Sequence, residues 1–160
     1  MRHRAAVFLL LIFCFAGGAR AQEGPGLFSR VEKVFQEKEP AWEVERVNRG
    51  DAPDPARRSY VFRSEEGQAS VDVSVWEKEK DAREAFSATV LSFDERMGRR
   101  MEKAAVPKLG DEGHIWTHPG RTAWPMLMFR KGKVNVTVFA PSVEVAKRFA
   151  QHVLEQMPAG

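Results

Sequence analysis

Cysteine is almost absent from this chain of 160 residues. The single cysteine, Cys14, lies in an apolar stretch near the start of the chain, and we expect this stretch to be removed during export. The remaining protein then has no disulfide, no thiolate nucleophile and no thiolate-bound metal. Cysteine-dependent enzymes and disulfide-stabilised scaffolds are therefore excluded, and the apolar core has to hold the fold.

Recognisable catalytic motifs are also lacking. The sequence has no glycine-rich phosphate-binding loop and no Gly-x-Ser-x-Gly nucleophile motif. One pair of adjacent carboxylates, Asp111 and Glu112, would point to opposite faces of a strand and so could not act on one substrate. These absences favour a protein that is not an enzyme and that needs no cofactor.

No apolar run is long enough to cross a membrane. The longest, Val7–Phe15, has nine residues, whereas a helix needs about 20 to span the hydrocarbon core. It follows the basic residues Arg2 and Arg4 and precedes a small-x-small sequence at residues 19–21, which is the pattern of a secretory signal peptide. We therefore expect residues 1–21 to be cleaved, which leaves an exported protein, periplasmic or extracellular, with no transmembrane anchor.

An excess of positive charge is lacking once this leader is removed. The whole chain has 25 basic and 22 acidic residues and a pI near 9.2, but residues 1–21 hold three arginines and no acid. The rest of the chain carries 22 charges of each sign. Because a neutral protein is not attracted to nucleic acid or to an anionic membrane, neither is expected as a partner.

What the sequence does have is an internal repeat. Tyr60–Arg63 leads through Gly67 to alternating apolar residues, and Leu127–Arg130 leads through Gly132 to a similar alternation. Apolar residues at helical spacing follow in each copy. The alternating residues are Ala69, Val71, Val73 and Val75 in the first copy, and Val134, Val136, Val138 and Ala140 in the second. The residues at helical spacing are Ala82, Ala85, Phe86, Val90 and Phe93, and then Ala146, Phe149, Ala150, Leu154 and Met157.

Each copy reads as a β-hairpin followed by a helix. Apolar residues at every second position, with polar residues between them, are typical of an antiparallel sheet with one face in water. Apolar residues three and four apart give a helix one stripe to pack on that sheet. A short helix over Leu27–Phe35, ended by Pro40, precedes the first copy, and strands over Trp42–Val47 and His114–His118 lead into the two copies.

These elements predict an α+β fold. We expect an antiparallel sheet with the helices on one side, and two halves related by an internal pseudo-two-fold repeat of hairpin plus helix. Residues 22–160 would form a single α+β domain, with repeat units at about residues 41–100 and 110–157.

The second copy contains a series of short motifs. These are Gly-Asp-Glu at residues 110–112, Phe-Arg-Lys-Gly at 129–132 before the alternating valines, Ala-Pro-Ser at 140–142 and Ala-Lys-Arg-Phe-Ala at 146–150. The pattern resembles a family of small exported bacterial proteins of unknown function. The order of elements is also similar to that of PsbP and Mog1 domains and of extracellular sensor-like domains of bacterial serine/threonine kinases. This layout implies a binding or accessory role by analogy and assigns no residue.

A group of residues that could hold a metal lies near residues 112–118. In an extended strand Glu112, His114 and His118 share one face, and His152 in the last helix could approach them. However, the Cα atoms of the two strand histidines would be about 13 Å apart at about 3.3 Å per residue, too far for one ion. A solvent-facing strand is the simpler interpretation, and a metal-binding protein or metal-dependent enzyme is the alternative function.

Arg63 and Arg130 occupy equivalent places in the two copies, each after a phenylalanine and just before the hairpin turn. Two guanidinium groups at symmetric positions would form a clamp for an anion or a carboxylate if the turns converged. Pairing with a nearby acid, such as Glu65, Glu66 or Asp72 for Arg63, is the simpler expectation.

Aromatic residues also fall among the polar positions. Trp76 and Phe139 are in phase with the polar residues of their strands, so either another element covers this face or it presents an apolar patch. The leading helix would be the cover, and a groove for a ligand is the alternative.

We therefore predict an exported, non-catalytic binding or accessory-interaction domain of the bacterial cell envelope. Its partner would be a protein, a peptide or a small apolar ligand. The candidate ligand-binding residues are Arg63, Trp76, Trp116, Arg130 and Phe139.

Overall fold

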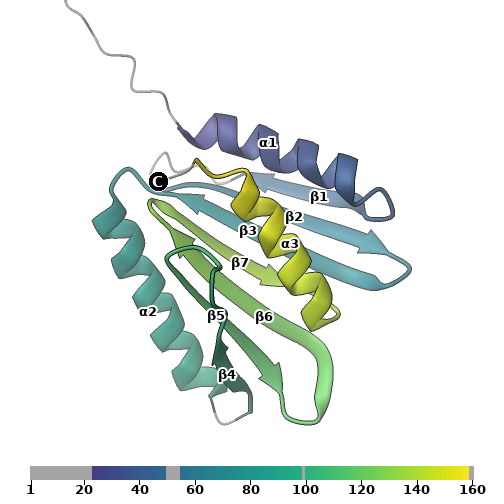
Figure 1. The fold of residues 1–160 in the computed structure, drawn as a ribbon, viewed down its shortest axis with the longest axis vertical. Coiled ribbons are helices and arrows are strands. Elements are labelled where there is room, and N and C mark those ends of the chain that lie inside the picture. The colour runs from purple at the N-terminus through teal and green to yellow at the C-terminus, as the bar shows by residue number, and fades with distance from the viewer. Residues whose placement is uncertain (1–22, 50–54, 99, 159–160) are drawn as a thin grey trace, which may run out of the picture.

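The structure, a computed structural model, describes residues 23–49, 55–98 and 100–158. The expected signal peptide, residues 1–21, lies outside the described residues. The elements follow in the order α1 (Glu23–Lys38), β1 (Glu43–Arg49), β2 (Ala56–Ser64), β3 (Gly67–Val75), α2 (Glu79–Met97), β4 (Glu102–Ala105), β5 (Glu112–His118), β6 (Arg121–Lys131), β7 (Val134–Phe139) and α3 (Val143–Glu155) (Figure 1).

These strands form one antiparallel sheet in the order β1-β2-β3-β7-β6-β5-β4. Both predicted hairpins are present, and both turn at a glycine with positive φ, Gly67 (+129°) and Gly132 (+55°). The α+β fold class is therefore confirmed. β4 is an addition to the predicted elements: it has four residues, all exposed, and pairs only with β5.

The alternating valines of the two copies lie together on one face of the sheet, as predicted. Strands β3 and β7 pair Val71 with Val138 and Val73 with Val136, and all four side chains are buried. Helices α1 and α3 lie side by side over this face (Figure 1). Removal of these apolar surfaces from water supplies the main driving force for folding.

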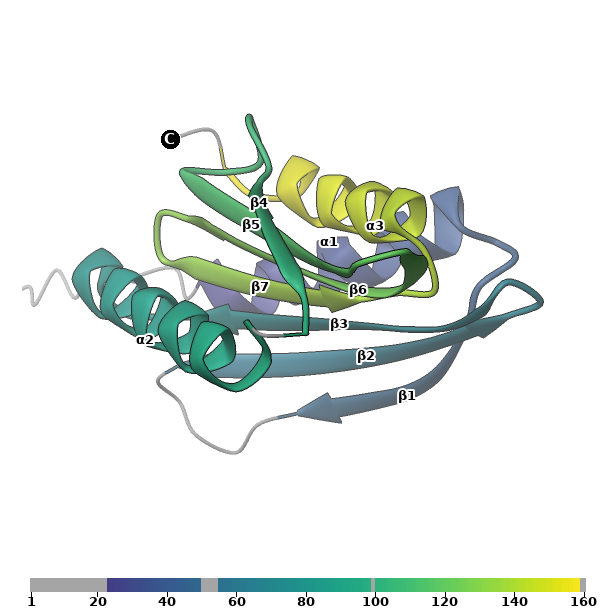
Figure 2. The same ribbon diagram turned by 90° about the horizontal axis from the view of Figure 1, so that it is seen from below.

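Helix α2 differs from the expectation that all helices share one side. It packs on the opposite face of the sheet, where Phe86 and Val90 join Trp116, Met126 and Met128 in a second apolar cluster. Figure 2 shows α2 apart from α1 and α3. The physical reason is that β6 is apolar at consecutive positions, so both faces of this part of the sheet have to be buried.

The repeat is consequently clearer in the strands than in the helices. The order of β1, β2 and β3 on one side of the central β3–β7 pair mirrors that of β5, β6 and β7 on the other. A two-fold axis normal to the sheet, between β3 and β7, would relate these strands. Such an axis keeps each face of the sheet on the same side, so it would place the equivalent helices α2 and α3 on one face. Instead, α1 accompanies α3. None of the helices in the described ranges combines the length and apolarity needed to cross a bilayer.

Tyr60, on the valine face, allows a test of this core. It is the only tyrosine in the chain, and its hydroxyl donates a hydrogen bond to the carbonyl of Phe28 at 3.3 Å. Burial, with the nearby negative charge of Glu32 as a smaller cause, raises the pKa of Tyr60 above its ordinary value. The neutral hydroxyl is therefore the form that the fold stabilises.

We expect the folded protein to show no tyrosinate absorbance until alkali unfolds it. Because the pKa of Tyr60 is higher in the folded than in the unfolded chain, stability is complete below the unfolded pKa of about 10 and falls as the pH rises above it. Tyr60→Phe should cost about 1 kcal/mol for the lost hydrogen bond and should remove this alkaline loss. Ordinary titration of Tyr60 in the folded state would contradict the packing of α1 on β2.

Candidate functional site

Helix α2 closes only part of the sheet face on which it packs. Its apolar cluster lies over β5 and β6, whereas the polar positions of β2, β3 and β7 belong to neither apolar cluster of the described chain. We call these positions the open face. The antiparallel register places on this side the polar residues Arg57, Ser59, Arg63, Gln68, Ser70, Asp72, Ser74, Asn135 and Thr137, together with the apolar Val61 and Phe139.

A pocket of about 150 Å³ lies where the open face meets α2. The sheet contributes Trp76, Asp72, Arg57 and Asn135, and α2 contributes Phe86. The remaining lining residues are Ser74, Ala85, Thr89, Met128, Val136 and Thr137. The half-buried indole of Trp76 is positioned by the end of β3, where its backbone N–H donates to the carbonyl of Lys133 at 2.9 Å.

Several polar groups that line this pocket have no partner within the described part of the chain. Asn135 donates through Nδ2 to the carbonyl of Ala82 at 2.9 Å, but its Oδ1 is buried without a partner. The indole Nε1 of Trp76 is also buried without an acceptor. The structure records no ion pair or hydrogen bond for the side chains of Arg57 and Asp72 among the described residues. Because buried polar groups normally find partners, the unpaired Trp76 Nε1 and Asn135 Oδ1 make this pocket the candidate binding site.

The N-terminal half of α2 is held on the sheet by polar links. The Asn135–Ala82 hydrogen bond lies at the pocket itself. Arg130 Nη1 lies 3.4 Å from Glu79 Oε1 in the first turn of the helix. The helical wall of the pocket is therefore fixed in position relative to the sheet.

The C-terminal half of α2 is held by Asp94. Its carboxylate accepts a hydrogen bond from Trp116 Nε1 at 2.7 Å and one from Lys103 Nζ at 2.8 Å. Desolvation would raise the pKa of Asp94, but the hydrogen bonds from Lys103 and Trp116 outweigh it and hold this pKa below its ordinary value. The charged form of Asp94 is thus the form that secures the helix.

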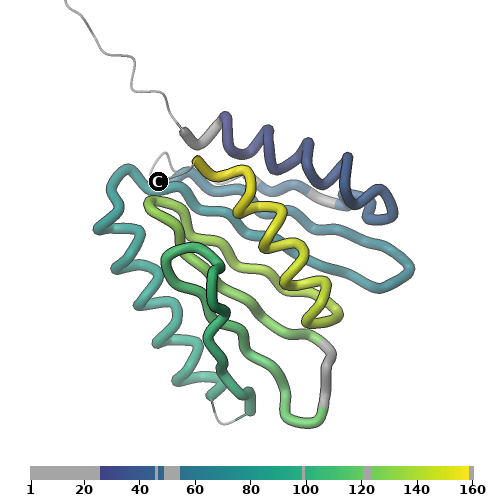
Figure 3. Tube along the Cα trace, viewed as in Figure 1, coloured from purple at the N-terminus to yellow at the C-terminus, as the bar shows by residue number. Residues whose placement is uncertain are grey.

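The two arginines proposed as a clamp lie at opposite ends of the sheet. Figure 3 shows the β2–β3 and β6–β7 turns at these ends, and the antiparallel pairing of β3 with β7 requires it. Arg63 Nη2 pairs with Glu45 at 3.2 Å. Arg130 is 7% exposed and pairs with Asp111 at 2.9 Å. Each arginine thus pairs with an acid of a neighbouring segment and does not take part in a clamp. The partner of Arg63 is Glu45, not Glu65, Glu66 or Asp72, which the sequence suggested.

The three candidate aromatic residues have different surroundings. Trp116 is fully buried beneath α2 and contacts no solvent. Phe139 is 38% exposed on the open face, and Trp76 lines the pocket. The element beside Trp76 is α2, whereas the sequence suggested that the leading helix would cover this face. Of the five candidates, Trp76, Phe139 and the exposed Arg63 remain accessible on the open face, whereas Trp116 and Arg130 are buried.

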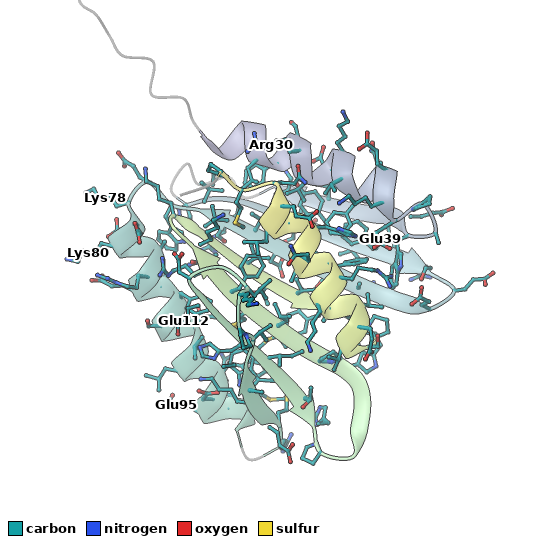
Figure 4. The ribbon with its side chains drawn as sticks, viewed as in Figure 1. Arg30, Glu39, Lys78, Lys80, Glu95 and Glu112 are labelled. Atoms are coloured by element: carbon teal, nitrogen blue, oxygen red, sulfur yellow. The ribbon has the colours of Figure 1, made fainter. Side chains whose placement is uncertain are left out.

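The four proposed metal ligands are not brought together. Glu112 and His114 contact each other at 2.9 Å on β5, and His118 Nδ1 lies 3.1 Å from the carbonyl of Arg100. His152 belongs to α3 on the other face, where its Nε2 lies 2.8 Å from Glu39 Oε1. Figure 4 labels Glu39 and Glu112 at separate places in the fold. Within the described ranges, no three His, Cys, Asp or Glu residues are arranged to hold a metal ion.

Comparisons with known proteins identify no family. No family model matches the chain, and no curated protein matches it significantly. Among solved structures, the chain is similar to a GTP binding regulator from Thermotoga maritima, with 13% identity over 79% of this chain and 85% of that chain and a TM-score of 0.49. A likeness at this level transfers no residue role and no activity. The comparisons do not confirm the similarity in layout to PsbP and Mog1 domains.

Proposed function

We propose that this protein is an exported, non-catalytic binding module of the bacterial cell envelope whose ligand occupies the open face and its pocket. The supporting observation is the pocket beside α2, where the buried, unpartnered Trp76 Nε1 and Asn135 Oδ1 lie among lining residues that include Asp72 and Arg57. The proposed export depends on the sequence of residues 1–21.

The composition of the pocket favours binding over catalysis. Its described lining has one carboxylate and one guanidinium group but no histidine, cysteine or second acid. General acid–base chemistry usually requires a group that titrates near neutral pH or a pair of carboxylates in different environments. An aromatic wall with a few polar groups is, in contrast, the usual composition of a ligand pocket.

Trp76→Ala should weaken ligand binding by at least about tenfold, because a partly buried tryptophan at the centre of a site commonly supplies 2 kcal/mol or more of the binding energy. Binding would be measured by calorimetric titration of the folded protein with a low-molecular-weight periplasmic extract. Circular dichroism would show that the variant remains folded.

Leu91→Ala provides the control. Leu91 is 60% exposed on α2 and does not line the pocket, so its removal should leave binding unchanged. Equal affinities of wild type and Trp76→Ala would exclude the pocket as the binding site.

A further inference from the structure

The net charge of the pocket restricts the chemistry of its ligand. Arg57 and Asp72 both line it, and their opposite charges leave it formally neutral. An anion would be attracted by Arg57 but repelled by Asp72, and a cation the reverse, so the pair gives no net preference for a ligand of either charge. The remaining polar lining residues, Ser74, Asn135 and Thr137, are uncharged. A neutral ligand that both donates and accepts hydrogen bonds fits this set.

The size and the apolar wall restrict the ligand further. A cavity of about 150 Å³ lined by apolar side chains accommodates a benzene molecule, so this pocket of about 150 Å³ has room for the atoms of one six-membered ring, and larger ring substituents would extend onto the open face. The half-buried Trp76 provides the apolar surface against which one face of such a ring would pack, and the buried Phe86 and Met128 lie at the base of the pocket. The polar groups would then meet its edge.

The backbone at this site makes a peptide a poorer fit. β3 is paired along its length with β2 on one side and with β7 on the other. Its N–H and C=O groups are therefore engaged, and a peptide cannot add to it as a further strand. Recognition here depends on side chains.

The pocket continues into a polar strip. Ser74, Asp72 and Ser70 follow one another on β3, beside Asn135 and Thr137 on β7. The strip ends at Phe139, which is opposite Ser70 and 38% exposed. Trp76 is six positions from Ser70, the partner of Phe139, so at about 3.3 Å per residue the Cα atoms of the two aromatic residues lie about 20 Å apart.

From these observations we infer that the ligand is a neutral saccharide, with one sugar ring in the Trp76 pocket and further rings of an oligosaccharide along the strip toward Phe139. A pyranose ring has one apolar face for the indole and hydroxyl groups that both donate and accept. Trp76 Nε1 and Asn135 Oδ1 are shielded from solvent, so a sugar reaches them only if the indole or the amide rotates. This inference rests on the proposed function of the open face.

Calorimetric titrations with defined sugars would test the inference. The probes are glucose and N-acetylglucosamine as single rings, and maltotetraose, cellotetraose and chitotetraose as chains. We expect at least one tetrasaccharide to bind, and to bind more tightly than its single ring. Trp76→Ala should weaken it by at least about tenfold. Asp72→Asn, which keeps the side-chain shape, should weaken binding of the tetrasaccharide several-fold. Phe139→Ala should remove the gain in affinity that the tetrasaccharide has over its single ring. Leu91→Ala should leave the affinity of both sugars unchanged.

Other results separate this inference from the proposed function. One such result is that tetra-alanine binds, that Trp76→Ala weakens this binding, and that none of the sugars binds. The saccharide inference would then fail, while the binding role of the open face would stand. If all five sugars fail at millimolar concentration, the inference also fails. If a sugar binds equally well to wild type and Trp76→Ala, both the inference and the assignment of the pocket fail.

Discussion

Glu39→Ala is expected to lower the free energy of unfolding by about 1.5–3 kcal/mol, because it removes the charged hydrogen bonds that this buried carboxylate accepts and leaves the 13% exposed side chain of His152 without its partner. Glu39 follows α1, is 7% exposed, and lies beside α3 (Figure 4). It accepts hydrogen bonds from Arg148 Nε at 2.7 Å and Nη2 at 3.2 Å, and His152 Nε2 lies 2.8 Å from the same carboxylate. Since both partners belong to α3, this carboxylate joins the two helices that cover the valine face.

The loss of unfolding free energy would be measured by urea denaturation at neutral pH. The slope of the unfolding free energy against urea concentration would be compared between wild type and variants. Glu155→Ala is the control, because Glu155 is an exposed acid that pairs with Lys38 at 2.8 Å between the same two helices. Exposed ion pairs contribute little, so this control should leave the urea midpoint nearly unchanged. If Glu39→Ala behaved like Glu155→Ala, the buried cluster would not secure α1.

Gly110→Ala is expected to cause a loss of similar size through the backbone. Gly110 has φ +69°, and a Cβ atom there would lie 2.3 Å from the carbonyl oxygen of Arg130. That oxygen also accepts the backbone N–H of Asp111 at 2.8 Å. The left-handed conformation alone costs about 1–2 kcal/mol for alanine, and forcing the turn apart adds about 1–3 kcal/mol. The turn holds Asp111 against Arg130, which in turn contacts Glu79 of α2.

Gly120→Ala is a matched control for Gly110→Ala. Gly120 has the same φ of +69°, but a Cβ atom there would meet nothing within 4 Å. Its cost should therefore be limited to the conformational term of about 1–2 kcal/mol. Thermal and urea unfolding of both variants would give the difference. Equal losses would show that the turn at Gly110 relaxes without cost and does not lock Arg130.

The elements that the sequence predicted correctly are those with strong local patterns. The valines at every second position required a sheet with one apolar face, and Gly67 and Gly132 marked the turns. The start of α3 is a further local feature, because Ser142 accepts the backbone N–H of Val145 at 3.2 Å as a helix N-cap. Local chemistry alone determines such features.

The features that the sequence did not predict depend on tertiary packing. The apolar stripe of α2 identifies the helix residues that are buried but not the face of the sheet on which they pack. Only the consecutive apolar residues of β6, such as Met126 and Leu127, indicate that both faces of the sheet are buried there. β4 is short and fully exposed, so pairing with β5 is what supports it. No local pattern indicates such an element.

The candidate site was predicted in part. The polar phase of Trp76 and Phe139 placed both residues on the face that carries the pocket. Trp116 shares the sheet face on which α2 packs, but its burial could not be foreseen without the position of that helix. Arg57 and Phe86 were not singled out because they come from separate elements and meet at the pocket only in the fold.

A ligand in the pocket beside Trp76 would change the surroundings of its indole, so the indole N–H signals should be followed in a ¹⁵N NMR titration. The chain has four tryptophans. Trp42 and Trp116 are buried and Trp124 is exposed, and none of these three lines the pocket. On addition of the periplasmic extract, the signal of Trp76 should shift while those of Trp42 and Trp116 stay in place. Binding that leaves the Trp76 signal unchanged would show that the ligand does not occupy this pocket.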